Sequence, residues 1–305
     1  MERKIIKGTY RDYIFLFGDR RTTYSDLSAK RSAAEKNLYI MIEDNMPAGY
    51  ICVNFEENLF KVNYAYTVPE KRCHGVFTEL LKHLTELADG YEVLITIPER
   101  QKNFDSIVKI CKSLGFSQDG ILKIFRTNWA AMRDWKENYF DKFMETQGHK
   151  YLEYFSRRNF KTYSFNDAPQ KYLEQLYHSQ ENFFENPFEV KNFFDGSYKN
   201  FVAKDLSFIA VKNDKLSAYY LITFSDDKNI FVGQTAVAKE YLNSGLMFIL
   251  CDKVIRAIYD RKCESLTFAV YSDNLPALKF DAKVTRNLKF IESRSYEYLF
   301  AGNFS

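Results

Sequence analysis

The sequence predicts a mixed α/β fold built from two similar halves. Short apolar strands alternate with amphipathic helices along the chain, and the second half repeats the order of elements found in the first. At 305 residues the chain is long for a single core and suits two domains. Its 46% content of hydrophobic residues can fill both cores and excludes a low-complexity, disordered chain.

The elements of the first half follow from apolar periodicity and from turn residues. The expected order is a strand at 4–9, helices at 10–20 and 24–36, strands at 38–43, 49–55 and 60–68, a helix that ends before Gly90, a strand at 93–97, a helix at 104–114 and a strand at 121–126. The residues Asn45-Met-Pro-Ala separate the strands at 38–43 and 49–55, and their composition predicts the turn of a β-hairpin.

The second half repeats this order after an aromatic helical connector. The expected order is a strand at 160–165, helices at 169–184 and 188–194, strands at 208–211, 217–224 and 230–237, a helix at 246–259, a strand at 266–270, a helix at 275–284 and a strand at 295–300. Gly75 and Gly245, each in a strand-to-helix turn, stand 170 positions apart, as a duplication would leave them. We therefore expect an N-terminal domain at 1–128, a packed connector at 129–150 and a C-terminal domain at 151–305.

The charge of the chain argues against two classes of partner. Its 43 basic and 40 acidic residues are evenly spread and give a net charge of +3, so neither nucleic acid nor an anionic membrane is indicated. The chain contains no uninterrupted apolar run near the length of about 18 residues that a membrane span needs. Its first residues lack the apolar region of a signal peptide, and we expect a cytoplasmic protein.

The cysteine pattern does not predict a metal site or a disulfide framework. Five cysteines form an odd set without a Cys-x-x-Cys pair, and only four histidines could join them as ligands. The simplest interpretation of each cysteine is a small buried hydrophobic residue that stays reduced.

Two strand-to-helix turns have the composition of a phosphate-binding site. At such a turn, unpaired backbone N–H groups and the positive end of the helix dipole can face an anion. The expected cofactor-binding residues of the first half are Val68, Arg72, Cys73, His74, Gly75, Val76, Phe77 and Thr78. Those of the second half are Val237, Gly245, Leu246 and Met247, together with Asn274 farther along the chain. The alternative is a plain connecting turn with a glycine, which many α/β proteins contain.

The first of these turns resembles motif A of the GNAT acyltransferase family, whose core reads Arg/Gln-x-x-Gly-x-Gly/Ala. In Val68-Pro-Glu-Lys-Arg-Cys-His-Gly-Val-Phe-Thr-Glu-Leu-Leu81, Arg72 and Gly75 match that core, and Phe77 replaces its last small residue. The second copy, at 237–250, keeps Gly245 but has Leu242 and Met247 at the other two positions. Each half also retains a different later part of the family signature. These parts are Lys112-Ser-Leu-Gly-Phe116 in the first half and Asn274 with Ala277 in the second.

The resemblance implies two tandem GNAT-like domains, each a mostly antiparallel twisted sheet flanked by helices, and a cofactor that is acetyl-CoA or another short acyl-CoA. In the family, strands four and five splay apart, the pantetheine arm lies between them, and a strand-four backbone N–H polarises the thioester carbonyl. The implied function is an acyl-CoA-dependent N-acyltransferase that transfers an acetyl group to a primary amine of a small metabolite or peptide.

The candidates for proton transfer depart from the family pattern. Cys111 stands where the family has its proton-donating Tyr, although a buried helix residue is the simpler interpretation, and the same count in the second half leads to Asp281, which suits the role only if its pKa is raised. Tyr66 and Gln234 are the strand-four candidates for relaying the amine proton. Further candidates are Asn63, Tyr64 and Thr235 on those strands, and Glu43, Glu56 and Glu185 from neighbouring elements, where surface charge is the alternative. A phenylalanine stripe could line an acceptor pocket or simply pack in the core, and comprises Phe183, Phe184, Phe188, Phe193 and Phe194.

Two other functions remain open at this point. A non-catalytic GNAT-fold protein that binds acyl-CoA or acts as a scaffold would explain the missing small residue in both turns and the missing Tyr. An aminoacyl-tRNA-dependent transferase would show a basic groove or a coiled-coil arm, and the sequence shows neither. Between the two halves, we expect the first to bind the cofactor, because it keeps Arg72 together with Gly75.

Overall fold

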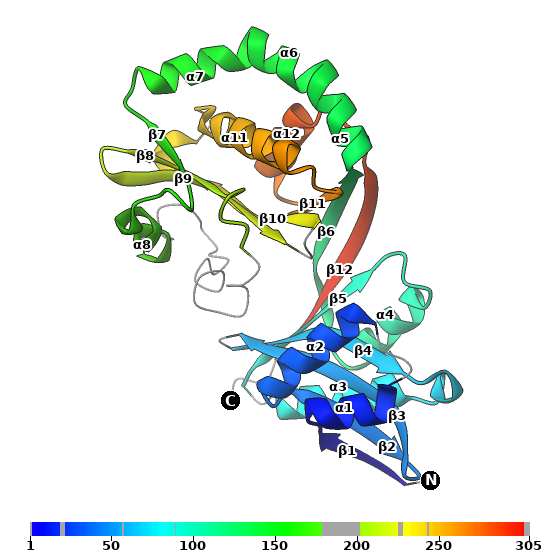
Figure 1. Ribbon diagram of the computed structural model, residues 1–305. Coiled ribbons are helices and arrows are strands. Elements are labelled where there is room, and N and C mark those ends of the chain that lie inside the picture. The colour runs from blue at the N-terminus through cyan, green and yellow to red at the C-terminus, as the bar shows by residue number, and fades with distance from the viewer. Residues whose placement is uncertain are drawn as a thin grey trace. The chain divides into compact units, whose positions relative to one another are not determined.

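The computed structural model describes residues 2–18, 22–56, 58–88, 90–178, 202–224, 228–242 and 244–301. The chain forms two compact units (Figure 1). Unit 1 consists of Met1–Leu122 together with Ser293–Ser305, and unit 2 consists of Lys123–Glu292. The mixed α/β class expected from the sequence is confirmed in both.

The sheet of unit 1 is mostly antiparallel. Its strands are β1 (Arg3–Lys7), β2 (Leu38–Glu43), β3 (Met46–Glu56), β4 (Leu59–Thr67), β5 (Glu92–Pro98), the first part of β6 (Ser117–Asn128) and β12 (Ile291–Ala301). Their spatial order is β1-β2-β3-β4-β5-β12-β6, and β4 and β5 run parallel. Strand β5 pairs antiparallel with β12, so the last strand of the chain completes the sheet of unit 1.

Helices cover both faces of this sheet. They are α1 (Tyr10–Phe17), α2 (Thr23–Ala34), the 3-10 helix η2 (Pro69–Lys71), α3 (Val76–Leu87) and α4 (Phe104–Ser113). Alternate residues of β2 divide between two cores, as the period of a strand requires. Leu38 and Ile40 pack with α1 and α2, whereas Tyr39 and Met41 pack with α3 and α4.

Unit 2 repeats the arrangement. Its strands are the second part of β6, β7 (Lys161–Ser164), β8 (Phe208–Lys212), β9 (Lys215–Phe224), β10 (Asn229–Val237) and β11 (Ser265–Tyr271). Their order is β6-β11-β10-β9-β8-β7, with β10 and β11 parallel. Its helices are α5 (Trp129–Trp135), the π-helices η3 (Lys136–Phe140) and η4 (Met144–Gly148), α6 (Asp141–Phe143), α7 (His149–Ser156), α8 (Gln170–His178), the 3-10 helix η6 (Lys239–Tyr241), α11 (Leu246–Arg261) and α12 (Leu275–Val284).

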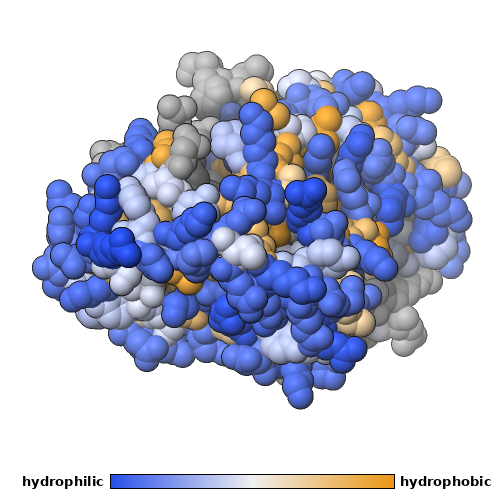
Figure 2. Space-filling view, turned by 90° about the horizontal axis from the view of Figure 1, so that it is seen from above, coloured by the Kyte–Doolittle hydropathy of each residue, from blue (hydrophilic) through white to orange (hydrophobic). Residues whose placement is uncertain are grey.

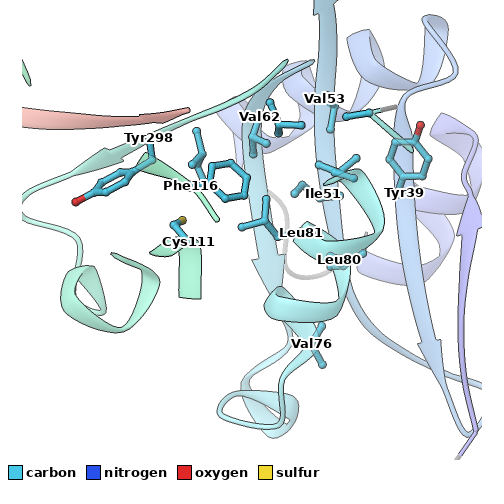
Figure 3. Packing of buried hydrophobic residues seen from close by; sticks show 14 of the residues in the cluster. Tyr39, Ile51, Val53, Val62, Val76, Leu80, Leu81, Cys111, Phe116 and Tyr298 are labelled. Carbon is cyan, nitrogen blue, oxygen red and sulfur yellow. The ribbon is translucent and has the colours of Figure 1, made fainter. Parts of the chain in front are cut away.

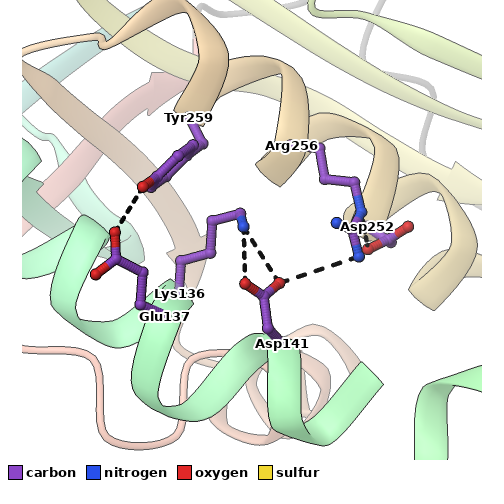
Figure 4. A network of polar contacts seen from close by, with 6 residues as sticks. All are labelled: Lys136, Glu137, Asp141, Asp252, Arg256 and Tyr259. Carbon is purple, nitrogen blue, oxygen red and sulfur yellow. Dashed lines mark hydrogen bonds and ion pairs between the residues drawn. The ribbon is translucent and has the colours of Figure 1, made fainter. Parts of the chain in front are cut away.

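The aromatic connector belongs to unit 2 and packs closely on α11. Helices α5 to α7 run end to end past α11 (Figure 1). Polar contacts from this helical run reach α11 (Figure 4): Tyr259 Oη donates to Glu137 at 2.6 Å, and Arg256 Nη2 lies 4.0 Å from Asp141 Oδ1. The apolar cluster beneath these contacts includes Trp135 and Phe248. The connector is therefore packed, as its aromatic composition predicts.

The compact units differ from the sequential segments 1–128 and 151–305 that the sequence analysis delimits. The final strand, β12, lies in unit 1, where Tyr298 is buried in the core with Cys111 and Phe116 (Figure 3). Residues 129–150 form one compact body with the second half instead of a separate connector. Local patterning predicts that a strand exists at 295–300, but it does not predict with which sheet that strand pairs.

The hairpin turn also lies elsewhere than expected. Asp44 and Asn45 form it, with φ of 49° and 64°, and Pro47 lies inside β3. A two-residue hairpin turn of type I′ needs positive φ at both positions, which Asn and Asp tolerate better than most residues. The second half has the same turn at Asn213 and Asp214, with φ of 49° and 61°.

The surface shown in Figure 2 is dominated by hydrophilic residues, with smaller hydrophobic areas between them. Within the described ranges, no helix is long and apolar enough to cross a membrane. The expected helix 188–194, the phenylalanine stripe Phe183, Phe184, Phe188, Phe193 and Phe194, and Glu185 lie outside the described residues. The expected helix 169–184 is described only as α8, up to His178.

Candidate cofactor site

The two strand-to-helix turns are structural repeats of each other. Strands β4 and β10, the short helices η2 and η6, and the glycines Gly75 and Gly245 are all offset by 170 positions. In unit 1 the residue after β4 donates its backbone N–H to a carbonyl in the bulge of β3. In unit 2 the residue after β10 makes the same hydrogen bond to the bulge of β9. Val68 N lies 3.0 Å from Ala48 O, and Ala238 N lies 2.9 Å from Ser217 O. The internal repeat expected from element order is thus present at the level of backbone hydrogen bonds.

In both units the parallel strands at the centre of the sheet diverge. The register of β4 with β5 ends at Val62 and Ile95, although β4 continues to Thr67. The register of β10 with β11 likewise ends at Phe231 and Thr267. A bulge lies just beyond this point in each unit. The pairing of β4 with β3 skips Asn63, and the pairing of β10 with β9 skips Gly233. The backbone therefore leaves regular pairing where the strands separate.

The turn of unit 1 exposes its backbone toward solvent. Helix α3 begins after Gly75, whose φ is 79°, and no side chain caps its first N–H groups. Residues Arg72, Cys73 and His74 are exposed, whereas Val68 and Val76 are buried. A Cβ built on Gly75 would meet only Arg3 Nη1, at 3.7 Å. A helix N-terminus of this kind can bind an anionic group closely.

The turn of unit 2 has the same backbone but a covered glycine. Gly245 has a φ of 88°, and a Cβ built on it would lie 2.5 Å from two ring carbons of Tyr151. Tyr151, from α7, stacks on Phe248 with ring centroids 5.4 Å apart. At this turn Leu242 is 60% exposed. The space next to Gly245 is therefore filled by an aromatic ring of the same unit.

The other expected cofactor residues of unit 2 have structural partners of their own. Val237 is half-buried at the end of β10, Leu246 is buried, and Met247 packs against the cluster around Leu250. Asn274 caps α12, because its Oδ1 accepts a hydrogen bond from the Ala277 N–H at 3.2 Å.

The expected proton donor of unit 1 lies in the hydrophobic core. Cys111 is fully buried on α4, between Phe116 and Tyr298 (Figure 3), and burial raises the pKa of its thiol to about 12. The counterpart in unit 2 is Asp281, again 170 positions later, and burial raises the pKa of its carboxyl to about 7. A carboxyl group with a raised pKa stays protonated to a higher pH, which is the direction that proton donation requires.

The strand-four candidates face the helices α1 and α2 in unit 1. Tyr66 packs against Tyr50 and Phe17, with ring centroids 5.6 and 6.3 Å apart. Tyr64 lies on the same face, stacked on Tyr50 at 5.9 Å. Gln234 occupies the position of Tyr64 in unit 2, on β10, opposite Leu221. Tyr66 therefore belongs to unit 1 and Gln234 to unit 2.

Two expectations about single residues are corrected. Glu43 is not a surface charge, because its side chain is fully buried and pairs with Arg3 and Lys71. Cys73 is not a buried hydrophobic residue; it is exposed, with a φ of 63°, because the turn before α3 passes through it. Arg3 and Tyr151 carry no sequence signal of a role at these turns, because each contacts its turn from an element far away in sequence.

Comparisons with known proteins agree with this geometry. Residues 173–283 match the family model described as the acetyltransferase (GNAT) family. A search of the curated proteins finds no match to this sequence. Among solved structures, a GCN5-related N-acetyltransferase from Sphaerobacter thermophilus is 14% identical, with a TM-score of 0.63 over 98% of this chain and 95% of that one. A tandem GNAT protein from the clavulanic acid biosynthesis pathway is 13% identical, with a TM-score of 0.63 over the full length of both chains.

At these identities the solved structures show the fold, and the family model adds sequence evidence for the second half. The chain therefore has the fold of the tandem GNAT structures over nearly its whole length, and within it residues 173–283 match the sequence model of the GNAT family.

Proposed function

We propose that the protein is an acyl-CoA-dependent N-acyltransferase and that unit 1 binds the cofactor. The observation that carries the proposal is the difference between the two glycine turns. Gly75 has open space beside it, whereas Tyr151 fills the space beside Gly245. We infer acetyl-CoA or another short acyl-CoA as the cofactor, and a primary amine of a small metabolite or peptide as the acceptor, in the cytoplasm.

The residues of the first turn suit a pyrophosphate. The backbone N–H groups from about His74 to Thr78 lie at the positive end of α3, and Arg72 adds an exposed cation beside them. Phe77, which replaces the small residue of the family motif, packs against the hydrophobic cluster beneath α3. Because the Phe77 ring packs against this cluster, its size does not prevent a phosphate from approaching the backbone of the turn.

The cofactor would supply an activated acyl thioester. The acyl end suits the region where β4 and β5 diverge beyond Val62, next to the bulge at Asn63. There a backbone N–H of β4 would polarise the thioester carbonyl, as the family resemblance implies. Tyr64 and Tyr66, on the face of β4 toward α1 and α2, would border the acceptor amine and relay its proton through water.

The cofactor assignment is tested by titration calorimetry with CoA on two matched variants. Gly75→Asp should abolish binding, because it places a side chain and a negative charge at the anion turn. Gly90→Asp is the control: Gly90 has a similar φ of 77° and open space around it, but it lies beyond the other end of α3. Equal affinities of the two variants would refute the assignment of the cofactor to this turn.

A second candidate function is a GNAT-fold protein that binds acyl-CoA without transferring the acyl group. The burial of Cys111 at the position of the family's proton donor favours it. Release of free thiol from acetyl-CoA in the presence of a panel of primary amines distinguishes the two. Amine-dependent release above the rate of the Gly75→Asp variant supports transfer, whereas binding of CoA with no release supports the second candidate.

A further inference from the structure

We propose that Glu43 is a positioning residue for the cofactor turn of unit 1, acting through Arg3 and Lys71. The inference rests on the proposed binding of acyl-CoA at Gly75. Glu43 ends β2, far in sequence from the turn, and Arg3 stands opposite it on β1. The three residues form a charged triad that holds the segment 71–75 in place.

The contacts of the triad reach the turn at two points. Arg3 Nε donates to Glu43 Oε1 at 2.8 Å, and Lys71 Nζ pairs with Glu43 Oε2. A second nitrogen of the same guanidinium, Arg3 Nη2, donates to the carbonyl oxygen of His74 at 2.6 Å. One buried carboxylate thus fixes Lys71, at the end of η2, and through Arg3 also fixes His74, directly before Gly75.

The carboxylate of Glu43 remains charged although its side chain is fully buried. Hydrogen bonds from Lys71 and then from Arg3 hold the pKa of this carboxyl below its ordinary value. A buried charge that is paired on both oxygens is strongly oriented, and removal of one partner leaves the other unpaired. The three side chains therefore keep one arrangement, and they hold the backbone at Lys71 and His74 in one position.

The turn needs such support because side-chain packing does little to hold it. Residues 72–75 are all exposed. Cys73 also adopts a φ of 63°, and a left-handed conformation of a non-glycine residue costs about 1 kcal/mol. An unsupported segment would populate other conformations, and ordering it would then weaken phosphate binding.

Unit 2 offers an internal comparison. Lys212 ends β8 as Glu43 ends β2, and Tyr241 ends η6 as Lys71 ends η2. In unit 2 the ammonium group of Lys212 lies between two aromatic rings at this place. Lys212 Nζ is 5.1 Å from the ring centroid of Phe160 and 5.5 Å from the ring centroid of Tyr241. The charged triad accompanies the open turn, and its aromatic replacement accompanies the turn whose glycine is covered by Tyr151.

The test compares variants of the full chain for CoA affinity by titration calorimetry. Glu43→Gln and Lys71→Met should each weaken CoA binding about tenfold, the ratio expected for one charge-assisted hydrogen bond. Lys71→Arg, which keeps the ion pair, should retain the affinity of the unmodified protein. Lys212→Met, the matched change in unit 2, should change the CoA affinity by no more than about twofold.

Two features of the test separate positioning from other effects. Glu43→Gln makes the region more positive, so a direct electrostatic effect would strengthen CoA binding, whereas loss of positioning weakens it. Pantetheine lacks the pyrophosphate, and its binding, followed by NMR titration, should be unchanged in all variants. Equal weakening for CoA and pantetheine would overturn the inference, because it would indicate general damage to unit 1.

The outcomes also separate this inference from the proposed function. No CoA binding by the unmodified protein overturns both. Binding by the unmodified protein with full affinity in Lys71→Met overturns the inference alone. If circular dichroism shows that Glu43→Gln does not fold, the decision rests on Lys71→Met, since Lys71 lies partly at the surface, with its affinity compared to that of the unmodified protein at low and at high salt. A loss relative to the unmodified protein that persists at high salt supports positioning, whereas a loss that disappears there reflects the charge of Lys71 alone and overturns the inference.

Discussion

Replacing Gly245 with alanine should destabilise the protein much more than replacing Gly75 with alanine. Both glycines have a left-handed φ, 88° and 79°, so both changes carry the same backbone penalty of about 1 kcal/mol. The difference between them must come from the surroundings of the added methyl group. Beside Gly75 the nearest atom is 3.7 Å away, which is an ordinary contact distance.

Beside Gly245 the methyl group would lie 2.5 Å from two carbons of the Tyr151 ring. That ring is stacked on Phe248 and covered by Lys283, so it has little freedom to move aside. Overpacking of this kind costs about 1 to 3 kcal/mol. The total for Gly245→Ala is then about 2 to 4 kcal/mol, against about 1 kcal/mol for Gly75→Ala, and each kcal/mol lowers the Tm by roughly 2 to 4 °C in a unit of this size.

Differential scanning calorimetry measures both shifts, and hydrogen exchange at α3 and α11 assigns each shift to a unit. The double variant Gly245→Ala with Tyr151→Ala serves as the control. It should cost less than the two single changes added together, because the methyl group no longer meets the ring. Equal Tm shifts for the two glycine variants would refute the conclusion that Tyr151 fills the second turn.

Three further predictions follow from single residues and from the cofactor. CoA or acetyl-CoA should raise the Tm by mass action, and the absence of a shift at millimolar CoA would contradict the cofactor assignment. Cys111→Ser should lower stability by about 1 to 3 kcal/mol, because it buries a hydroxyl group in the core; a fall in turnover at unchanged stability and CoA affinity would instead identify Cys111 as the proton donor. Burial raises the pKa of Asp281 to about 7, so the unfolded chain loses this proton at a lower pH than the folded protein does. The free energy of unfolding should therefore fall as the pH rises from about 4 to 7. Asp281→Asn should therefore raise the Tm more at pH 8 than at pH 4, and thermal melts at the two pH values check this.

The parts of the fold that depend on local sequence could be predicted well. Gly75 and Gly245 mark left-handed positions between a strand and a helix, and apolar periodicity defines the helices that follow them. The hairpin turn was misplaced because Pro47 suggests a turn, whereas the residues that tolerate positive φ, Asp44 and Asn45, come just before it. In that hairpin Pro47 belongs to β3 and pairs with Ile42 in the register.

The long-range parts could not be predicted. The pattern of residues 291–301 is that of an ordinary strand, and nothing in it specifies β5 as its partner. The contact of Arg3 with His74 joins residues 71 positions apart, and it appears only once β1 and β2 are paired. Glu43 was a candidate base among several carboxylates, because burial and pairing cannot be read from its neighbours in sequence.

The match to the family model and the open strand-to-helix turn lie in different halves of this protein. The family model matches residues 173–283, a segment that contains Gly245, yet the residue that covers Gly245 is Tyr151, which lies outside that segment. A family pattern describes the elements that build the fold, namely the strands, the turn and the helix. Whether the turn can accept a phosphate depends on what packs against it, and in unit 2 that is a side chain from the helical connector. The first half, which the family model does not match, keeps its turn open, and a buried carboxylate contacts that turn through Arg3 and Lys71. We therefore assign cofactor binding by the surroundings of each turn and not by its likeness to the family.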